Sequence, residues 1–238
     1  MASTIQLQRT INRSSQFIRL APLTFASNTA NDPAFSNADW VMQTILAPPF
    51  AWRWNRNATA TPTNPTFKTT SGVTDYKVSL PDFGWIEKAV GYDVKDGFRA
   101  FELQIGLISG AESLQNEPSR IAAQYDDGEG NITFRLFPPP DDKDYNIVVE
   151  YQKSAPQFTS ATQTWTPIPD YLSFVYNTGY DSRAYEYMND PRFQSAAQLF
   201  YTQLASVAEG LDNTQKNIWL HDRLVSLHQT AAAQSGKV

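Results

Sequence analysis

The sequence predicts an α+β fold in which helices at both ends of the chain flank one antiparallel β domain. Two observations predict it. Apolar residues ahead of Pro48 and after Trp165 recur with the spacing of one helical face. Between about Phe67 and Tyr151 apolar and polar residues alternate, which is the pattern of half-buried strands. The chain shows no strand–helix–strand order and no internal repeat, so we do not expect a parallel sheet.

The N-terminal region, residues 1–57, is predicted to hold two helices and an arm. One face of the first helix is formed by Leu7, Ile11, Ser14 and Ile18. Pro22 ends this helix, and a polar loop runs from Asn28 to Pro33. The second helix is expected to begin at the capping-box-like pair Ser36 and Asp39, and Pro48-Pro49 ends it.

The central region, residues 58–165, is predicted to form the β domain after a linker rich in Thr, Pro and Asn. Its alternating runs are Tyr76, Val78 and Leu80; Ile132, Phe134 and Leu136; and Tyr145, Ile147, Val149 and Tyr151. Turn signals separate the runs, among them Asp96-Gly97 and Asp126–Gly130. Six or seven short strands of this kind indicate an antiparallel sandwich or a small barrel.

The C-terminal region, residues 166–238, returns to helical spacing. Pro169 and the pair Asp190-Pro191 are start signals. The clearest apolar face in the sequence consists of Phe193, Ala197, Phe200, Leu204, Val207 and Leu211. We expect this helix to pack against the N-terminal helix through Ile11 and Ile18. A last helix is predicted from Thr214 to about Gln229.

Composition excludes several function classes. The 238 residues include no cysteine, which removes disulfides, thiolate zinc sites and cysteine nucleophiles. A net charge of −5 argues against sequence-specific nucleic-acid binding, and no apolar run is long enough for a membrane span. Arg9, Arg13 and Arg19 interrupt the N-terminus, so we expect no signal peptide. Aromatic residues make up 13% and charged residues only 18%, which is typical of a surface that meets other proteins.

A search for catalytic motifs leads us to expect no catalytic, metal or cofactor site. His221 and His228 are two helical turns apart, roughly 10 Å, too far to share one zinc ion. The sequence has no phosphate-binding glycine loop and no nucleophile elbow. The acidic clusters 126–129 and 141–144 lack the spacing of a calcium loop and are interpreted as solvated turns.

The most unusual stretch is Trp52-Arg53-Trp54-Asn55-Arg56. In an extended strand both tryptophans would lie on one face, with Arg53 and Asn55 on the other. Trp and Arg dominate interface hot spots, so Trp52, Arg53, Trp54 and Arg56 are a candidate protein interface. A strand that buries both tryptophans in the core and leaves the arginines in solvent is the alternative.

Several segments together resemble a family of virion proteins. They are Pro48–Arg56, Tyr76–Ile86, Phe137–Pro140, Pro167–Tyr171 and Asp190–Arg192. Their order over roughly residues 36–215 is similar to the head-to-tail adaptor proteins of tailed bacteriophages, including the tail tubular A type.

The resemblance implies a helical bundle built from both ends of the chain, with a β-sandwich or barrel inserted. It further implies a homo-oligomeric ring, commonly of twelve subunits, located at the head–tail junction of the virion. Such a ring would bind the portal protein on one side and a neck or tail protein on the other, and DNA would pass through it. The acidic turn of Asp126, Asp127 and Glu129, or the turn 141–144, would then face a neighbour.

Two other functions remain open from the sequence. A carbohydrate- or receptor-binding virion protein would use the β domain and exposed tryptophans, but would not need long amphipathic C-terminal helices. An enzyme on a β-sandwich would require an acidic pair that meets in space.

Overall fold

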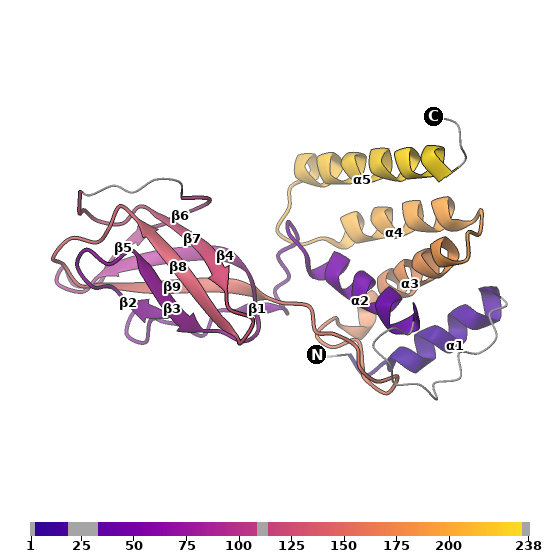
Figure 1. Cartoon of the computed structure of the whole chain (residues 1–238), viewed down its shortest axis with the longest axis horizontal. Helices are drawn as coiled ribbons and strands as arrows, with labels where there is room; N and C mark the ends of the chain where they lie inside the picture. Colours follow the sequence, from indigo (N-terminus) through magenta and orange to yellow (C-terminus); the bar gives the residue numbers. More distant parts are fainter. Residues whose placement is uncertain (1–2, 19–32, 109–113, 235–238) are drawn as a thin grey trace. The chain divides into compact units, whose positions relative to one another are not determined.

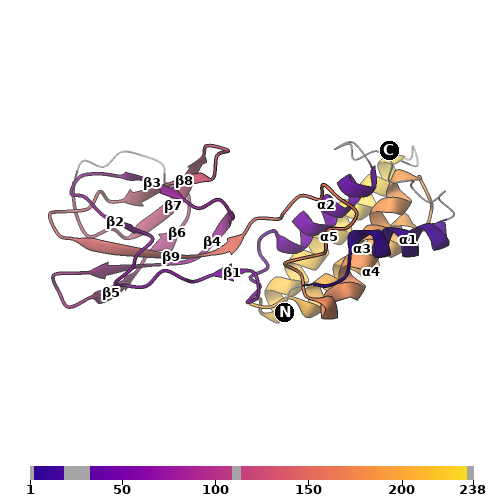
Figure 2. The ribbon, with the colours of Figure 1, turned by 90° about the horizontal axis from the view of Figure 1, so that it is seen from below.

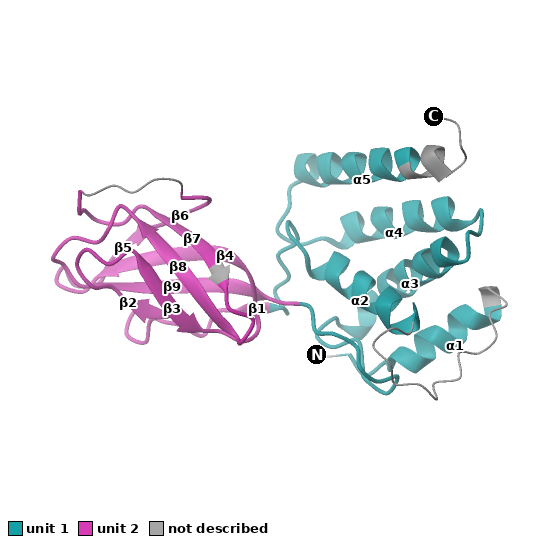
Figure 3. Ribbon diagram, in the orientation of Figure 1, with its two compact units in different colours: residues 1–55, 155–238 teal, residues 56–154 magenta. Residues whose placement is uncertain are grey.

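A computed structural model describes residues 3–18, 33–108 and 114–234. The described chain is α+β and forms two compact units (Figure 3). Residues 1–55 and 155–238 form the helical unit, and residues 56–154 form the β unit. Residues 155–165, which the sequence placed in the β domain, belong to the helical unit, where Trp165 is fully buried.

The described part of the helical unit is built from helices that come from both ends of the chain (Figure 1). They are α1 (Leu7–Ile18), α2 (Pro33–Leu46), the short 3₁₀ helix η1 (Asp170–Leu172), α3 (Ser173–Tyr187), α4 (Phe193–Val207) and α5 (Asn213–Gln234). The predicted start of α2 at Ser36 and Asp39 is wrong, because α2 begins at Pro33. Proline suits a first helical turn, where its missing N–H leaves no bond unmade. Asp39 instead accepts a hydrogen bond from the Phe158 backbone N–H at 2.7 Å.

The core of the helical unit centres on α3. This helix packs against α1, α2 and α4, and α4 packs in turn against α5 (Figure 1). Phe200 and Leu204 of α4 are fully buried in the same core as Ile11. The main partners of α4 are thus α3 and α5 rather than the N-terminal helix that the sequence predicted; the Ile18 side chain lies outside the described residues.

A glycine permits the close approach of the helices in this core. A Cβ atom on Gly179 of α3 would lie 2.7 Å from Cε2 of Phe200 and 3.0 Å from Cγ1 of Val41. Beside it, the ring of Trp165 stacks on that of Tyr176 with 4.4 Å between centroids. Trp165 Nε1 donates to Thr10 Oγ1 at 3.0 Å, so this aromatic pair links α3 to α1. The residues before η1 are thereby fixed to helices from both ends of the chain.

The β unit consists of two sheets in its described residues (Figure 2). Its strands are β1 (Arg56–Asn57), β2 (Phe67–Lys68), β3 (Asp75–Ser79), β4 (Phe83–Asp93), β5 (Arg99–Glu102), β6 (Gln104–Ile105), β7 (Arg120–Asp126), β8 (Asn131–Phe137) and β9 (Tyr145–Lys153). One sheet has the order β1-β9-β4-β5, with β2 also pairing with β9. The other has the order β3-β8-β7-β6, and only the β6–β7 pair is parallel.

A single apolar core lies between the two sheets. Its fully buried members include Phe134 and Leu136 of β8 and Tyr145 and Ile147 of β9. The alternating runs of the sequence supply these residues, because every second side chain of a strand points to the same face. The predicted strands at residues 76–80, 132–136 and 145–151 are therefore confirmed as β3, β8 and β9, and the two sheets favour the sandwich over the barrel.

Candidate functional site

Of the two tryptophans of the candidate interface, Trp52 lies in the core of the helical unit and Trp54 is half-buried against it. Trp52 is 1% exposed, and its Nε1 donates to the carbonyl of Ile45 at 2.7 Å. Trp54 stacks on Trp52 with 5.2 Å between ring centroids. Asn55 is also fully buried, and residues 53–55 form a turn. The prediction of an extended strand here is wrong, and the packing favours the interpretation of both tryptophans as core residues.

The two arginines of the same stretch have different surroundings. Arg53 is 88% exposed in its side chain, and its Nε lies 3.9 Å from a carboxylate oxygen of Glu209. Arg56 begins the β unit, where its Nε and Nη2 donate to the carboxylate of Glu87. Its Nη1 is also 3.9 Å from a carboxylate oxygen of Glu150. Arg53 therefore presents its charge to solvent, whereas the charge of Arg56 is largely compensated.

The acidic turn between β7 and β8 is held by its own carboxylates. Asp127 accepts hydrogen bonds from the backbone N–H groups of Glu129 and Asn131 and lies 3.0 Å from Lys77 Nζ. The Lys77 ammonium and these donors hold the pKa of Asp127 well below its usual range. Asp126 caps the turn by accepting from Gly128 N at 2.8 Å. Only Asp126 and Glu129 leave a carboxylate exposed for a partner.

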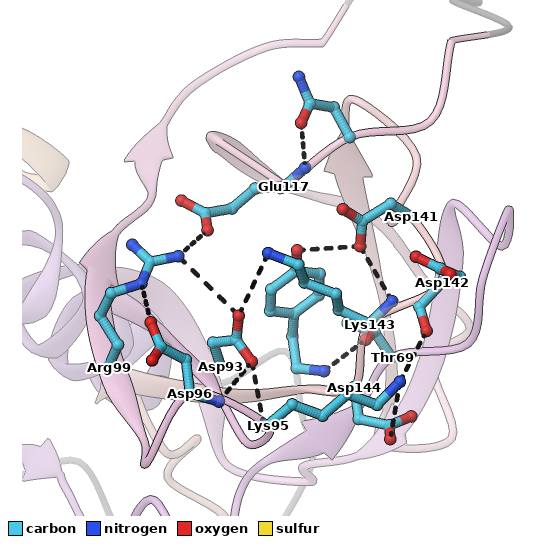
Figure 4. A network of polar contacts seen from close by, with 12 residues as sticks. Thr69, Asp93, Lys95, Asp96, Arg99, Glu117, Asp141, Asp142, Lys143 and Asp144 are labelled. Carbon is cyan, nitrogen blue, oxygen red and sulfur yellow. Dashed lines mark hydrogen bonds and ion pairs between the residues drawn. The ribbon is translucent and has the colours of Figure 1, made fainter.

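A larger polar network lies at the opposite end of the β unit, where β4 ends and β9 begins (Figure 4). Asp93, the last residue of β4, is 1% exposed. One of its carboxylate oxygens accepts the backbone N–H groups of Lys95 and Asp96 at 3.0 and 3.1 Å. The other lies 3.6 Å from Lys143 Nζ and 4.0 Å from Arg99 Nη2. Two cations and two N–H donors thus compensate a buried charge.

The outer part of this network ties three loops together (Figure 4). Arg99 donates to Asp96 at 3.1 Å and to the carboxylate of Glu117, which precedes β7. On the other side, Tyr145 Oη donates to Asp141 at 2.9 Å, and burial together with that carboxylate raises the pKa of Tyr145. The sequence indicated separate solvated turns here. It did not reveal the network, because its members are far apart in the chain and nothing local shows that Asp93 is buried among them.

The helical unit exposes large apolar side chains on η1, α3, α4 and α5 and at the residue that follows α3. Those with 40% or more of their surface exposed are Tyr171, Phe174, Tyr187, Met188, Leu199, Ile218 and Val225. Ile218 and Val225 are seven residues apart and lie on one face of α5, opposite the buried Leu227. These two side chains make this face of α5 a candidate surface for contact with another protein.

A pocket of about 220 Å³ is formed by α2, α4 and α5. Its walls include the aromatic rings of Trp40, Tyr201 and Trp219. The guanidinium of Arg223 lies over the Trp219 ring, 5.6 Å from the centroid, and also lines the pocket. An aromatic wall beside an arginine suits an apolar side chain of a partner protein.

The described residues include no group of three or more histidines and carboxylates arranged to hold a metal ion. Both His221 and His228 are exposed on α5. Among the described residues, no helix is long and apolar enough to cross a membrane.

These features, a polar network paired within the β unit and exposed apolar side chains on the helices, suit the class of proteins that act by contacting other proteins. Residues 15–223 match the family model described as SU10 adaptor protein. The match covers most of the chain, which therefore belongs to this family of phage head-to-tail adaptors. The resemblance inferred from the sequence is confirmed at the level of the family. No curated protein matches the chain.

Proposed function

We propose that the chain is a non-catalytic subunit of a homo-oligomeric ring at the head–tail junction of a phage virion. In this proposal twelve copies bind the portal protein on one side and a neck or tail protein on the other, and DNA passes through the ring. The helices from both ends of each chain form a bundle within it. A closer relation to the tail tubular A type remains a prediction from the sequence.

The observation that carries the proposal is the combination of the family match with the exposed apolar faces of the helical unit. A ring is closed by heterologous contacts, so one patch must fit a different patch on the neighbouring copy. The helical unit offers separate patches, with Ile218 and Val225 on α5 and with Tyr187 and Met188 at the end of α3. We expect these patches to meet in the ring, with Arg53 at their rim.

Passage of DNA is supported by charge. The residues of the β unit include ten Lys and Arg and fifteen Asp and Glu, so this unit carries the whole net charge of −5. A lumen that must release the phosphate backbone should be neutral or acidic. We expect one of the acidic turns, 126–129 or 141–144, to face a neighbouring component and set its orientation.

The alternative of a carbohydrate-binding protein has lost its main support. Sugar binding would use exposed aromatic rings, but Trp52 is buried and Trp54 is stacked on it. Five of the six tryptophans belong to the helical unit rather than to the β unit that would bind the sugar.

Native mass spectrometry of the purified chain tests ring formation. We expect a closed oligomer for the wild type and loss of it for Ile218→Glu, because a charge would be buried at the contact. Asn217→Glu is the matched control, since it adds the same charge at a neighbouring exposed position and should leave the oligomer intact. A wild-type chain that is monomeric both in solution and in virions would contradict the proposal.

The non-catalytic role has its own test. We expect chelators to leave the thermal unfolding midpoint unchanged and the purified ring to show no hydrolase activity. We also expect no tight, salt-sensitive DNA binding, because such binding would hold the genome inside the passage. Stoichiometric zinc or calcium in the purified particle would contradict the first expectation.

A further inference from the structure

A phenylalanine is held in an unusual backbone conformation at the tip of the β4–β5 turn. Gly97 and Phe98 both have positive φ angles, +60° and +62°, and Arg99 N donates to Asp96 O at 3.1 Å. Positive φ at both central residues is the geometry of a type I′ turn, where Asn and Gly are the usual residues. An aromatic L-residue in this region is strained, because its Cβ crowds the backbone.

The strained residue does not belong to the core of the β unit. Phe98 is 39% exposed and is not part of the apolar core between the two sheets. Residues 95–100 are all exposed, so the ring stands at the end of the β unit opposite residues 56 and 154. Phe98 is thus strained in its backbone without being a core residue. Backbone strain of this kind points to a contact outside the fold.

The turn that carries Phe98 is rigid. The buried carboxylate of Asp93 accepts the N–H groups of Lys95 and Asp96, and Asp96 in turn accepts from Arg99 (Figure 4). The turn is therefore fixed on both sides of the Phe98 tip. A pre-formed turn loses little conformational entropy on binding, as an aromatic anchor requires.

The charge around the tip indicates the partner. The network below Phe98 holds six carboxylates, those of Asp93, Asp96, Glu117, Asp141, Asp142 and Asp144, against the three cations of Lys95, Arg99 and Lys143. An acidic rim suits a basic surface. This chain has no net positive unit to offer, because the helical unit holds nine residues of each sign and the β unit is acidic. This balance favours a different protein over a second copy as the occupant.

We infer that Phe98 is the anchor through which the adaptor docks onto the next virion component, by inserting into an apolar pocket rimmed with Lys and Arg. The inference rests on the proposed function and adds to it the residue and the chemistry of the contact. Of the two acidic turns, it assigns partner binding to 141–144, which shares the network with Asp93, rather than to 126–129 at the other end.

The main test is complementation of a phage that carries a nonsense mutation in this gene. Phe98→Asn removes the ring but tolerates positive φ. We expect heads that carry the adaptor but lack the component beyond it, and a titre lower by about 100-fold or more, because the central anchor of the contact is lost. Leu107→Asn is the matched control, because Leu107 is 91% exposed on the same unit, and it should complement fully.

A charge variant tests the basic rim independently. Asp144 has 71% of its side chain exposed, and Asp144→Lys should lower the titre in the same direction by a smaller factor. Glu129→Lys makes the same change at the opposite end of the β unit and should complement at the wild-type level. Full complementation by Phe98→Asn, or equal loss with Glu129→Lys and Asp144→Lys, would overturn the inference.

Two measurements on the purified chain distinguish docking from a structural role of Phe98 and from self-association. Phe98→Asn should raise the thermal unfolding midpoint by a few degrees, because it relieves strain, and should leave the oligomer seen by native mass spectrometry unchanged. A lower midpoint would make Phe98 a structural residue, and a broken oligomer would make a second copy the occupant; either result overturns the inference. A monomeric wild type would instead count against the proposed ring.

Discussion

The two units divide charge unequally but share the aromatic residues almost evenly. The helical unit has nine charged residues of each sign, is neutral and contains five of the six tryptophans. The β unit carries the net charge of −5 and contains only Trp85. Aromatic residues nevertheless account for 12 of its 99 residues and for 19 of the 139 residues of the helical unit. The comparison teaches that acidity and tryptophan content, and not overall aromatic content, distinguish the two units.

The largest expected effect comes from the β core. Phe134 is fully buried between the rings of Phe67 and Phe83, so Phe134→Ala should cost about 3–5 kcal/mol. Each unit has its own core, so the loss should appear in the β circular dichroism of a urea titration. Tryptophan fluorescence, which reports mainly the helical unit, should keep its midpoint. If both signals shift equally, the units unfold as one.

Leu204→Ala makes the reciprocal change in the helical unit. Leu204 is fully buried in α4, and its truncation should cost about 2–5 kcal/mol. Here the urea midpoint measured by tryptophan fluorescence should fall, whereas the midpoint measured by the β circular dichroism should not change. An unchanged tryptophan midpoint would show that the core around α3 and α4 does not depend on this side chain.

Gly179→Ala should have a smaller effect on the helical unit, and two opposing contributions decide its sign. Alanine favours a helix over glycine by about 1 kcal/mol, but overpacking costs about 1–3 kcal/mol. A Cβ 2.7 Å from Phe200 forces the fully buried ring to move, so overpacking should win by about 1 kcal/mol. A thermal midpoint higher than that of the wild type would contradict the close packing.

The smallest effect concerns acid stability, which should fall more in the β unit than in the helical unit. The folded-state pKa of Asp127 lies below its usual 3.8, so the β unit loses stability as pH falls from 3.8 towards that pKa. In the helical unit the contributions oppose each other, because burial raises the pKa of Asp181 whereas the Arg192 guanidinium lowers the pKa of Asp190 to about 2. Between pH 5 and 3 the unfolding midpoint of the β signal should therefore fall further than that of tryptophan fluorescence, and Asp127→Asn should reduce the loss in the β signal.

The sequence predicted the regular elements whose period is clear. The spacing of Leu7, Ile11 and Ser14 marks α1, and the alternation of Tyr145 to Tyr151 marks β9. The prediction from sequence failed where a contact outside the local pattern decides the structure. The alternation of Trp52 and Trp54 resembles a strand, yet the hydrogen bond from Trp52 to the carbonyl of Ile45 places the ring in a helical core.

The same limit applies to the candidate site. Asp96-Gly97 is a visible turn signal, but nothing local shows that Asp93 is buried or that Lys143 lies beside it. Phe98 could be noticed only once its φ angle was known, because a phenylalanine after glycine is ordinary in a sequence. Strain and spatial convergence are properties of the fold, and the proposed anchor Phe98 was recognised only through them.

The pairing of β1 with β9 has a consequence for the history of the chain. Arg56 is opposite Gln152, so the β unit starts and finishes on neighbouring strands. A module with adjacent ends can be grafted into a host protein, or removed from it, with little disturbance of either. In the ring proposed above, the unit that recognises the next virion component could therefore be exchanged by recombination, while the helical unit, which would hold neighbouring subunits together, is retained.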